Sequence, residues 1–136
     1  MIGIVVVSHG LLSEQLIGAA SLILGEAKAV KAITFMARES LEDLRKKTSE
    51  AASEFTEDGC LIFTDIMGGS ATNVSIEIMK SRNDVYVVTG VNLPMLLEAI
   101  NSRESSSLKD LANQVSNSGT RSIINLKEYF EKRAKR

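Results

Sequence analysis

His9 is the only histidine in this sequence of 136 residues, and only Ser8 separates it from an apolar run that covers residues 2–7. Imidazole is the side chain whose charge ordinarily changes between about pH 5 and 8, so His9 is the first candidate for chemistry. Two further polar turns follow apolar runs, one beginning at Asp65 and one at residues 90–94, which contains Asn92. Because ligands gather beyond the carboxyl ends of strands in open α/β sheets, these turns are candidate site positions.

A histidine beside a carboxylate can act as a nucleophile. If Asp65 accepts a hydrogen bond from one ring nitrogen of His9, the tautomer is set and the other nitrogen presents its lone pair. Attack on a phosphoryl group would place an anion on that nitrogen. We therefore consider His9 and Asp65 as candidate catalytic residues, although each also fits an ordinary turn.

An anion on His9 would need hydrogen-bond donors, and two glycine turns can supply them. Gly10 follows His9, and the turn after Asp65 contains Gly68, Gly69 and Ser70 before the next helix. Glycines free the backbone to bring N–H groups close to an anion at a helix N-terminus. We expect these four residues to support a phosphoryl group.

Other reaction classes lack their motifs in this sequence. It contains no nucleophile elbow of the G-x-S-x-G type, no phosphate-binding P-loop and no dinucleotide fingerprint. One histidine and one cysteine cannot form a zinc site of the usual type, so we expect no metal and no cofactor. A net charge of −1 argues against nucleic acid as a partner.

The composition is that of one globular domain spanning residues 1–136, with 44% hydrophobic and 24% charged residues. The apolar runs are too short to cross a bilayer, so we expect no membrane insertion. The single cysteine, Cys60, lies in an apolar run and is expected to be buried and inert. The absence of an intrachain disulfide fits a cytoplasmic protein.

Helical and strand patterns alternate along the chain. Ser40 is expected to cap the second helix and Gly119 to end the last one, while residues 127–136 form a charged, solvated tail. A last short strand is expected at residues 122–126. The other expected strands are residues 2–7, 31–36, 60–64 and 85–89, and the expected helices are residues 13–24, 40–55, 71–81, 95–100 and 108–118.

This alternation predicts an α/β fold, a doubly wound and mainly parallel sheet of four strands with helices on both faces. In such sheets the first and third strands are commonly neighbours at the switch point. His9 and Asp65 would then lie at the same edge of the sheet.

Three segments together resemble the mannose-type (mannose, fructose and sorbose) enzyme IIA domain of the bacterial sugar phosphotransferase system. The resemblance covers nearly the whole chain in the same order and spacing. The segments are IVVVSHG at residues 4–10, TDIMGGSATN at residues 64–73 and TGVNLPML at residues 89–96.

The resemblance implies a phosphocarrier. His9 matches the histidine that accepts a phosphoryl group from the histidine-containing phosphocarrier protein and donates it to an enzyme IIB. Asp65 matches the residue that bonds this histidine and leaves Nε2 for phosphorylation, and Ser70 matches a residue near the phosphoryl group. The resemblance also implies a homodimer in which a C-terminal strand, here residues 122–126, crosses to the partner.

The sequence departs from the family in the glycine turn. Met67 stands near the position where the family often has tryptophan, and Ala71 replaces the usual proline. Both changes should keep the backbone donors but can alter partner contacts. Since the sequence has no second histidine, we expect the enzyme IIB to be a separate protein.

Other functions remain open at this point. A regulatory protein of the same family would be phosphorylated at His9 and would act by binding partners, and neighbouring genes would separate it from a transport subunit. The phosphotransfer subunit of dihydroxyacetone kinase has a different glycine turn. A receiver phosphorylated at Asp65 would need acidic metal ligands after the first strand, where this chain has Ser8 and His9.

Overall fold

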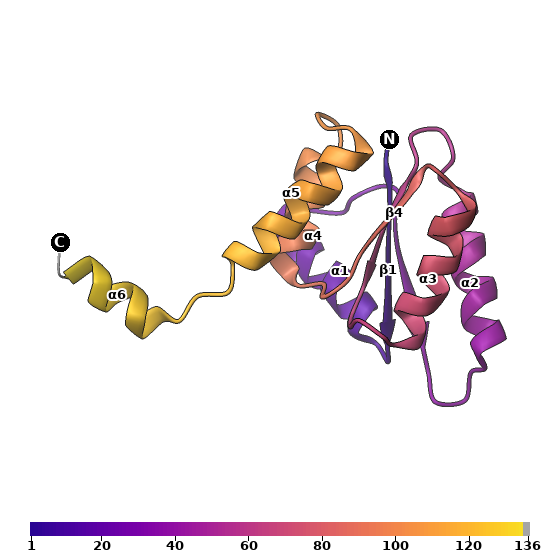
Figure 1. The fold of residues 1–136 in the computed structure, drawn as a ribbon, viewed down its shortest axis with the longest axis horizontal. Coiled ribbons are helices and arrows are strands. Elements are labelled where there is room, and N and C mark those ends of the chain that lie inside the picture. The colour runs from indigo at the N-terminus through magenta and orange to yellow at the C-terminus, as the bar shows by residue number, and fades with distance from the viewer. Residues whose placement is uncertain (135–136) are drawn as a thin grey trace.

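The computed structural model describes residues 1–134, which form four strands and six helices around one parallel sheet (Figure 1). The sheet order is β2-β1-β3-β4, so the chain forms the doubly wound α/β fold predicted from the alternating pattern. The elements are β1 (Gly3–His9), α1 (Leu12–Leu24), β2 (Val30–Phe35), α2 (Leu41–Ser53), β3 (Cys60–Thr64), α3 (Ser70–Ser81), β4 (Val85–Val88), α4 (Leu93–Ser102), α5 (Leu108–Arg121) and α6 (Leu126–Ala134).

Helices cover both faces of the sheet, as predicted. Successive residues of β1 point to opposite faces, so Ile4 and Val6 belong to one apolar cluster and Val5 and Val7 to another. The first cluster packs under α1, α4 and α5, and the second under α2 and α3 (Figure 1). Burial on both faces explains why β1 is an unbroken apolar run.

The register of the sheet places the two candidate catalytic residues at one edge. Strands β1 and β3 are parallel neighbours, with Val7 opposite Thr64. His9 and Asp65 therefore lie at the carboxyl ends of adjacent strands, as the switch-point rule predicted.

Local signals predicted most helix ends. Ser40 caps α2 through a reciprocal capping box with Asp43, and Gly25 ends α1 with a φ of 82°. The expectation that Gly119 ends α5 is wrong, because the helix continues to Arg121. A Cβ at Gly119 would lie 2.4 Å from Cγ of Met95, so this glycine permits close packing of α5 against α4.

Within this single chain, residues 122–126 pair with no strand, and the exchange with a partner expected for them stays a prediction. The chain leaves α5 at Ser122, and α6 begins at Leu126, where the Asn125 side chain accepts a hydrogen bond from the Glu128 amide. A strand needs a neighbouring strand whose backbone groups can pair with its own. Here the chain leads into α6, which extends away from the sheet (Figure 1). The expected charged, solvated tail at residues 127–136 is exposed as far as residue 134, where it forms most of α6, and residues 135 and 136 lie outside the described part.

Cys60 is fully buried in β3, as expected, and desolvation raises the pKa of its thiol to about 12. Such a thiol is protonated and inert at neutral pH. Within residues 1–134, no helix is both long and apolar enough to cross a membrane.

Candidate functional site

His9 and Asp65 form two hydrogen bonds through one carboxylate oxygen. Asp65 Oδ2 accepts a bond from the backbone amide of His9 at 2.8 Å and lies 2.7 Å from Nδ1 of the His9 ring. The other oxygen, Oδ1, accepts a bond from the amide of Ile66 at 2.9 Å. The carboxylate thus contacts both the main chain and the side chain of His9, which holds the imidazole in one orientation.

Asp65 remains ionised in this setting. Desolvation by burial raises the pKa of its carboxyl, but the bonds from the His9 amide, the His9 ring and the Ile66 amide together outweigh it, and the pKa lies below its usual value. An ionised carboxylate can only accept hydrogen bonds, so the proton shared with the ring must reside on Nδ1. In the neutral ring, Nε2 then presents its lone pair.

The His9 side chain is reachable from solvent. Half of its surface is exposed, whereas the Asp65 side chain is 10% exposed. Phe35 at the end of β2 contacts the ring edge-on, with 6.1 Å between the ring centroids. The imidazole is thus held on one side and open on the other, as an accessible nucleophile requires.

The N-terminus of α3 lies beside the His9 ring. A Cβ at Gly69 would lie 3.1 Å from Cε1 of His9, so the absence of a side chain allows this approach. No side chain caps α3, and its first turn has no acidic residue. Gly68, with a φ of 80°, provides the left-handed turn into the helix. The first amides of α3 are therefore available to an anion near His9.

Gly10 contributes backbone geometry. It has a φ of 57°, and its amide donates to the carbonyl of Phe35 at 2.9 Å, so that amide is already engaged. The start of α1 is tied to β1 by Ser8, whose Oγ accepts a bond from the amide of Ser13 at 2.7 Å. Ser70 is the first residue of α3, next to Gly69, and is half-buried.

Sequence reasoning missed two buried hydroxyl residues near this edge, Ser8 and Thr72. Ser8 precedes the histidine, and Thr72 lies in the first turn of α3. A serine or threonine in a turn or a first helical turn is common, so only their burial marks them out. Asn92 caps α4 by accepting a bond from the Met95 amide at 3.1 Å, which accounts for the third polar turn.

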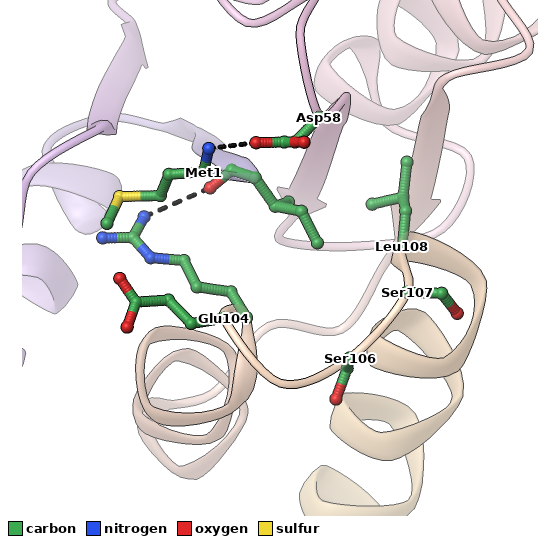
Figure 2. Close-up of a pocket in the computed structure, with 8 residues that line it drawn as sticks. Met1, Asp58, Glu104, Ser106, Ser107 and Leu108 are labelled. Atoms are coloured by element: carbon green, nitrogen blue, oxygen red, sulfur yellow. Dashed lines mark hydrogen bonds and ion pairs between the residues drawn. The ribbon is translucent and has the colours of Figure 1, made fainter.

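A cavity of about 370 Å³ lies at the opposite, amino-terminal end of the sheet. Figure 2 shows Met1 paired with Asp58, and Arg103 donates to the carbonyl of Ile2 at 3.3 Å. These polar groups satisfy one another, so this cavity offers no reactive group comparable with His9. Among residues 1–134, no cluster of three or more His, Cys, Asp or Glu side chains is placed to hold a metal ion.

Comparisons with known proteins find several relatives of this chain. The fructose-specific EIIA component of the phosphotransferase system of Bacillus subtilis (strain 168) is 30% identical over 133 residues, which cover 97% of this chain and 91% of that protein. The mannose-specific EIIAB component of Escherichia coli (strain K12) is 36% identical over 104 residues, which cover 76% of this chain and 32% of that longer protein.

A crystal structure of the phosphotransferase system component EIIA from Streptococcus agalactiae superposes with a TM-score of 0.89 at 31% identity, and the match covers 94% of this chain and 99% of that one. The family model for the fructose IIA component of the phosphotransferase system matches residues 3–116. This chain therefore belongs to the fructose- and mannose-type IIA family of the phosphotransferase system.

Proposed function

We propose that this protein is a phosphocarrier in which Nε2 of His9 accepts a phosphoryl group from the histidine-containing phosphocarrier protein. His9 then donates the group to an enzyme IIB. The observation that supports this most strongly is the half-exposed His9 ring, whose Nδ1 is held 2.7 Å from Asp65. That contact leaves Nε2 as the nucleophilic atom.

The transfer needs positioning and charge stabilisation. The lone pair of Nε2 attacks phosphorus, the bond from phosphorus to the donor nitrogen breaks, and its electron pair returns to the donor ring. Asp65 stabilises the ring as it becomes more positive, and the uncapped N-terminus of α3 beside Gly69 stabilises the phosphoryl oxygens. Gly10, Gly68 and Ser70 shape the turns that bring these groups together.

The partner surface around His9 is apolar, which suits transient docking of another protein. Exposed large side chains flank the histidine on the turns after β1, β2 and β3 and at the first residue of α1. They are Leu11, Leu12, Met36, Ile66 and Met67.

We also propose that the protein is a homodimer that uses its C-terminal arm, residues 122–134. Every described residue from 123 onward is exposed, and several are large and apolar, including Ile123, Ile124 and Phe130. The arm extends away from the sheet, so its apolar side chains find no cover in the same chain (Figure 1). A second copy would provide that cover.

The phosphocarrier proposal is tested by incubating the protein with radioactive phosphoenolpyruvate, enzyme I and the phosphocarrier protein. We expect one acid-labile and base-stable phosphate per chain, as phosphohistidine requires. Because His9 is the only histidine, His9→Gln should accept no label. Labelling of that variant, or no labelling of the natural protein, would contradict the proposal.

A further inference from the structure

The hydroxyl of Thr72 joins three parts of the chain at the carboxyl edge of the sheet. Thr72 lies in the first turn of α3 and is 2% exposed. Its Oγ1 lies 2.5 Å from the carbonyl oxygen of Ile66, 2.7 Å from Oγ1 of Thr64 and 3.4 Å from Oγ1 of Thr89. These partners follow or end β3 and β4.

Counting protons sets the direction of each bond. A hydroxyl has one proton to donate and two lone pairs that accept. The Ile66 carbonyl can only accept, so the Thr72 proton is committed to it. Thr64 must then donate to Thr72, and Thr89 can approach only as a second donor. The full bonding capacity of the Thr72 hydroxyl is therefore used.

We propose that Thr72 is a positioning residue for Asp65. Asp65 lies between Thr64 and Ile66, and the Thr72 hydroxyl bonds both of these neighbours. The main chain after Asp65 is thus held at the Ile66 carbonyl, and the residue before it is held through the Thr64 side chain. These two bonds set where the carboxylate meets the amide and ring of His9. Thr72 acts on His9 through Asp65.

The same hydroxyl couples the two halves of the site. Thr72 follows Ser70 and Ala71 at the start of α3, whose amides are the proposed donors to a phosphoryl group. Its bond to the Ile66 carbonyl fixes this helix start relative to the turn that carries Asp65. The distance between the Asp65 carboxylate and the first amides of α3 is therefore fixed. The importance of this distance for phosphoryl transfer rests on the proposed phosphocarrier function.

The test compares Thr72→Val, which keeps the shape and removes the hydroxyl, with Thr72→Ser, which keeps the hydroxyl. The matched control is Thr48→Val, because Thr48 is also fully buried and its hydroxyl donates to a carbonyl, that of Leu44, at 2.8 Å. Nitrogen-15 NMR of the His9 ring at about pH 9 reports which nitrogen carries the proton, and no phosphate is involved.

We expect the natural protein to have its ring proton mainly on Nδ1. In Thr72→Val the ratio of the Nδ1–H to the Nε2–H form should fall roughly tenfold, the effect of weakening a charge-assisted hydrogen bond, and the rate of phosphoryl acceptance should fall by a similar factor. Thr72→Ser should restore both quantities to within about twofold. Thr48→Val should lose stability and leave both unchanged.

An unchanged tautomer ratio in Thr72→Val, or a failure of Thr72→Ser to restore it, would overturn the inference. If Thr72→Val does not fold, Thr64→Val decides, because it removes the bond on the other side of Asp65 and should shift the ratio in the same direction. The two proposals can also fail separately. If Thr72→Val shifts the tautomer ratio but the natural protein accepts no phosphate on His9, the positioning role is supported and only the proposed function is refuted.

Discussion

Asp65 accepts three hydrogen bonds, and two of them come from His9. One carboxylate therefore controls both where the ring lies and which of its nitrogens carries the proton. A turn former or helix cap at this position would bond its own turn, as Asn92 does at the start of α4. The bonds to His9 distinguish Asp65 from a residue that only shapes a turn.

Replacing Asp65 with alanine should slow phosphoryl acceptance and keep the fold. A hydrogen bond to a charged group is worth about 1.5–3 kcal/mol, so loss of tautomer control and of stabilisation of the ring predicts a rate roughly 10- to 100-fold lower. The rate is measured with limiting phosphocarrier protein, and the fold is checked by circular dichroism.

Asp43→Ala is the matched control for this measurement. It removes a carboxylate that also accepts a backbone bond, in the capping box of α2, and should reduce stability by about 1 kcal/mol without slowing transfer. Equal transfer rates in Asp65→Ala and the natural protein would remove the proposed role of Asp65.

Strand-end residues were the predictable part of the site, because a polar residue that stops a buried apolar run must lie at a sheet edge. His9 after β1 and Asp65 after β3 both follow this rule. The contribution of Thr72 was not predictable, since it depends on a contact between the first turn of α3 and a carbonyl six residues earlier. Such contacts depend on the path of the loop, which composition and periodicity do not encode.

Helix and strand packing shows the same division between local and tertiary information. The spacing of apolar residues predicted each of the four strands and the first five helices, with ends that differ by a few residues. Gly119 was misread because glycine has two uses, ending a helix and allowing close contact. The sequence around it does not distinguish the contact with Met95 from a helix end.

Two glycines in regular elements should respond in opposite ways to alanine. A Cβ at Gly3 in β1 would lie 2.0 Å from Cγ of Phe55, so Gly3→Ala should destabilise the fold by about 1–3 kcal/mol through overpacking. Gly18 in α1 has open space around it, so Gly18→Ala should stabilise by about 0.5–1 kcal/mol through helix propensity.

Urea denaturation followed by circular dichroism measures both changes, and each variant serves as the control for the other. Destabilisation by Gly18→Ala would contradict the open surroundings of that position. A neutral Gly3→Ala would mean that Phe55 moves aside without cost.

The C-terminal arm, residues 122–134, extends away from the rest of the single chain (Figure 1). Residues 123 and 124 are β-branched, which favours a strand, but the chain presents no sheet edge beside them and continues into α6. The sheet has two edge strands, β2 and β4, because the strand order begins and ends with them. An exposed apolar arm and an open sheet edge are both features that a second copy can cover.

The dimer should depend on the apolar side chains of this arm. Ile124→Glu places a charge where the proposed interface must exclude water, and an unpaired buried charge is costly, so we expect it to convert a dimer into a monomer at micromolar concentration. Leu22→Glu is the matched control, since Leu22 is an exposed apolar residue of α1, outside the arm, and should leave the dimer intact. Sedimentation velocity measures the masses of all three proteins. A monomeric natural protein, or a dimer that survives Ile124→Glu, would show that the arm does not hold two copies together.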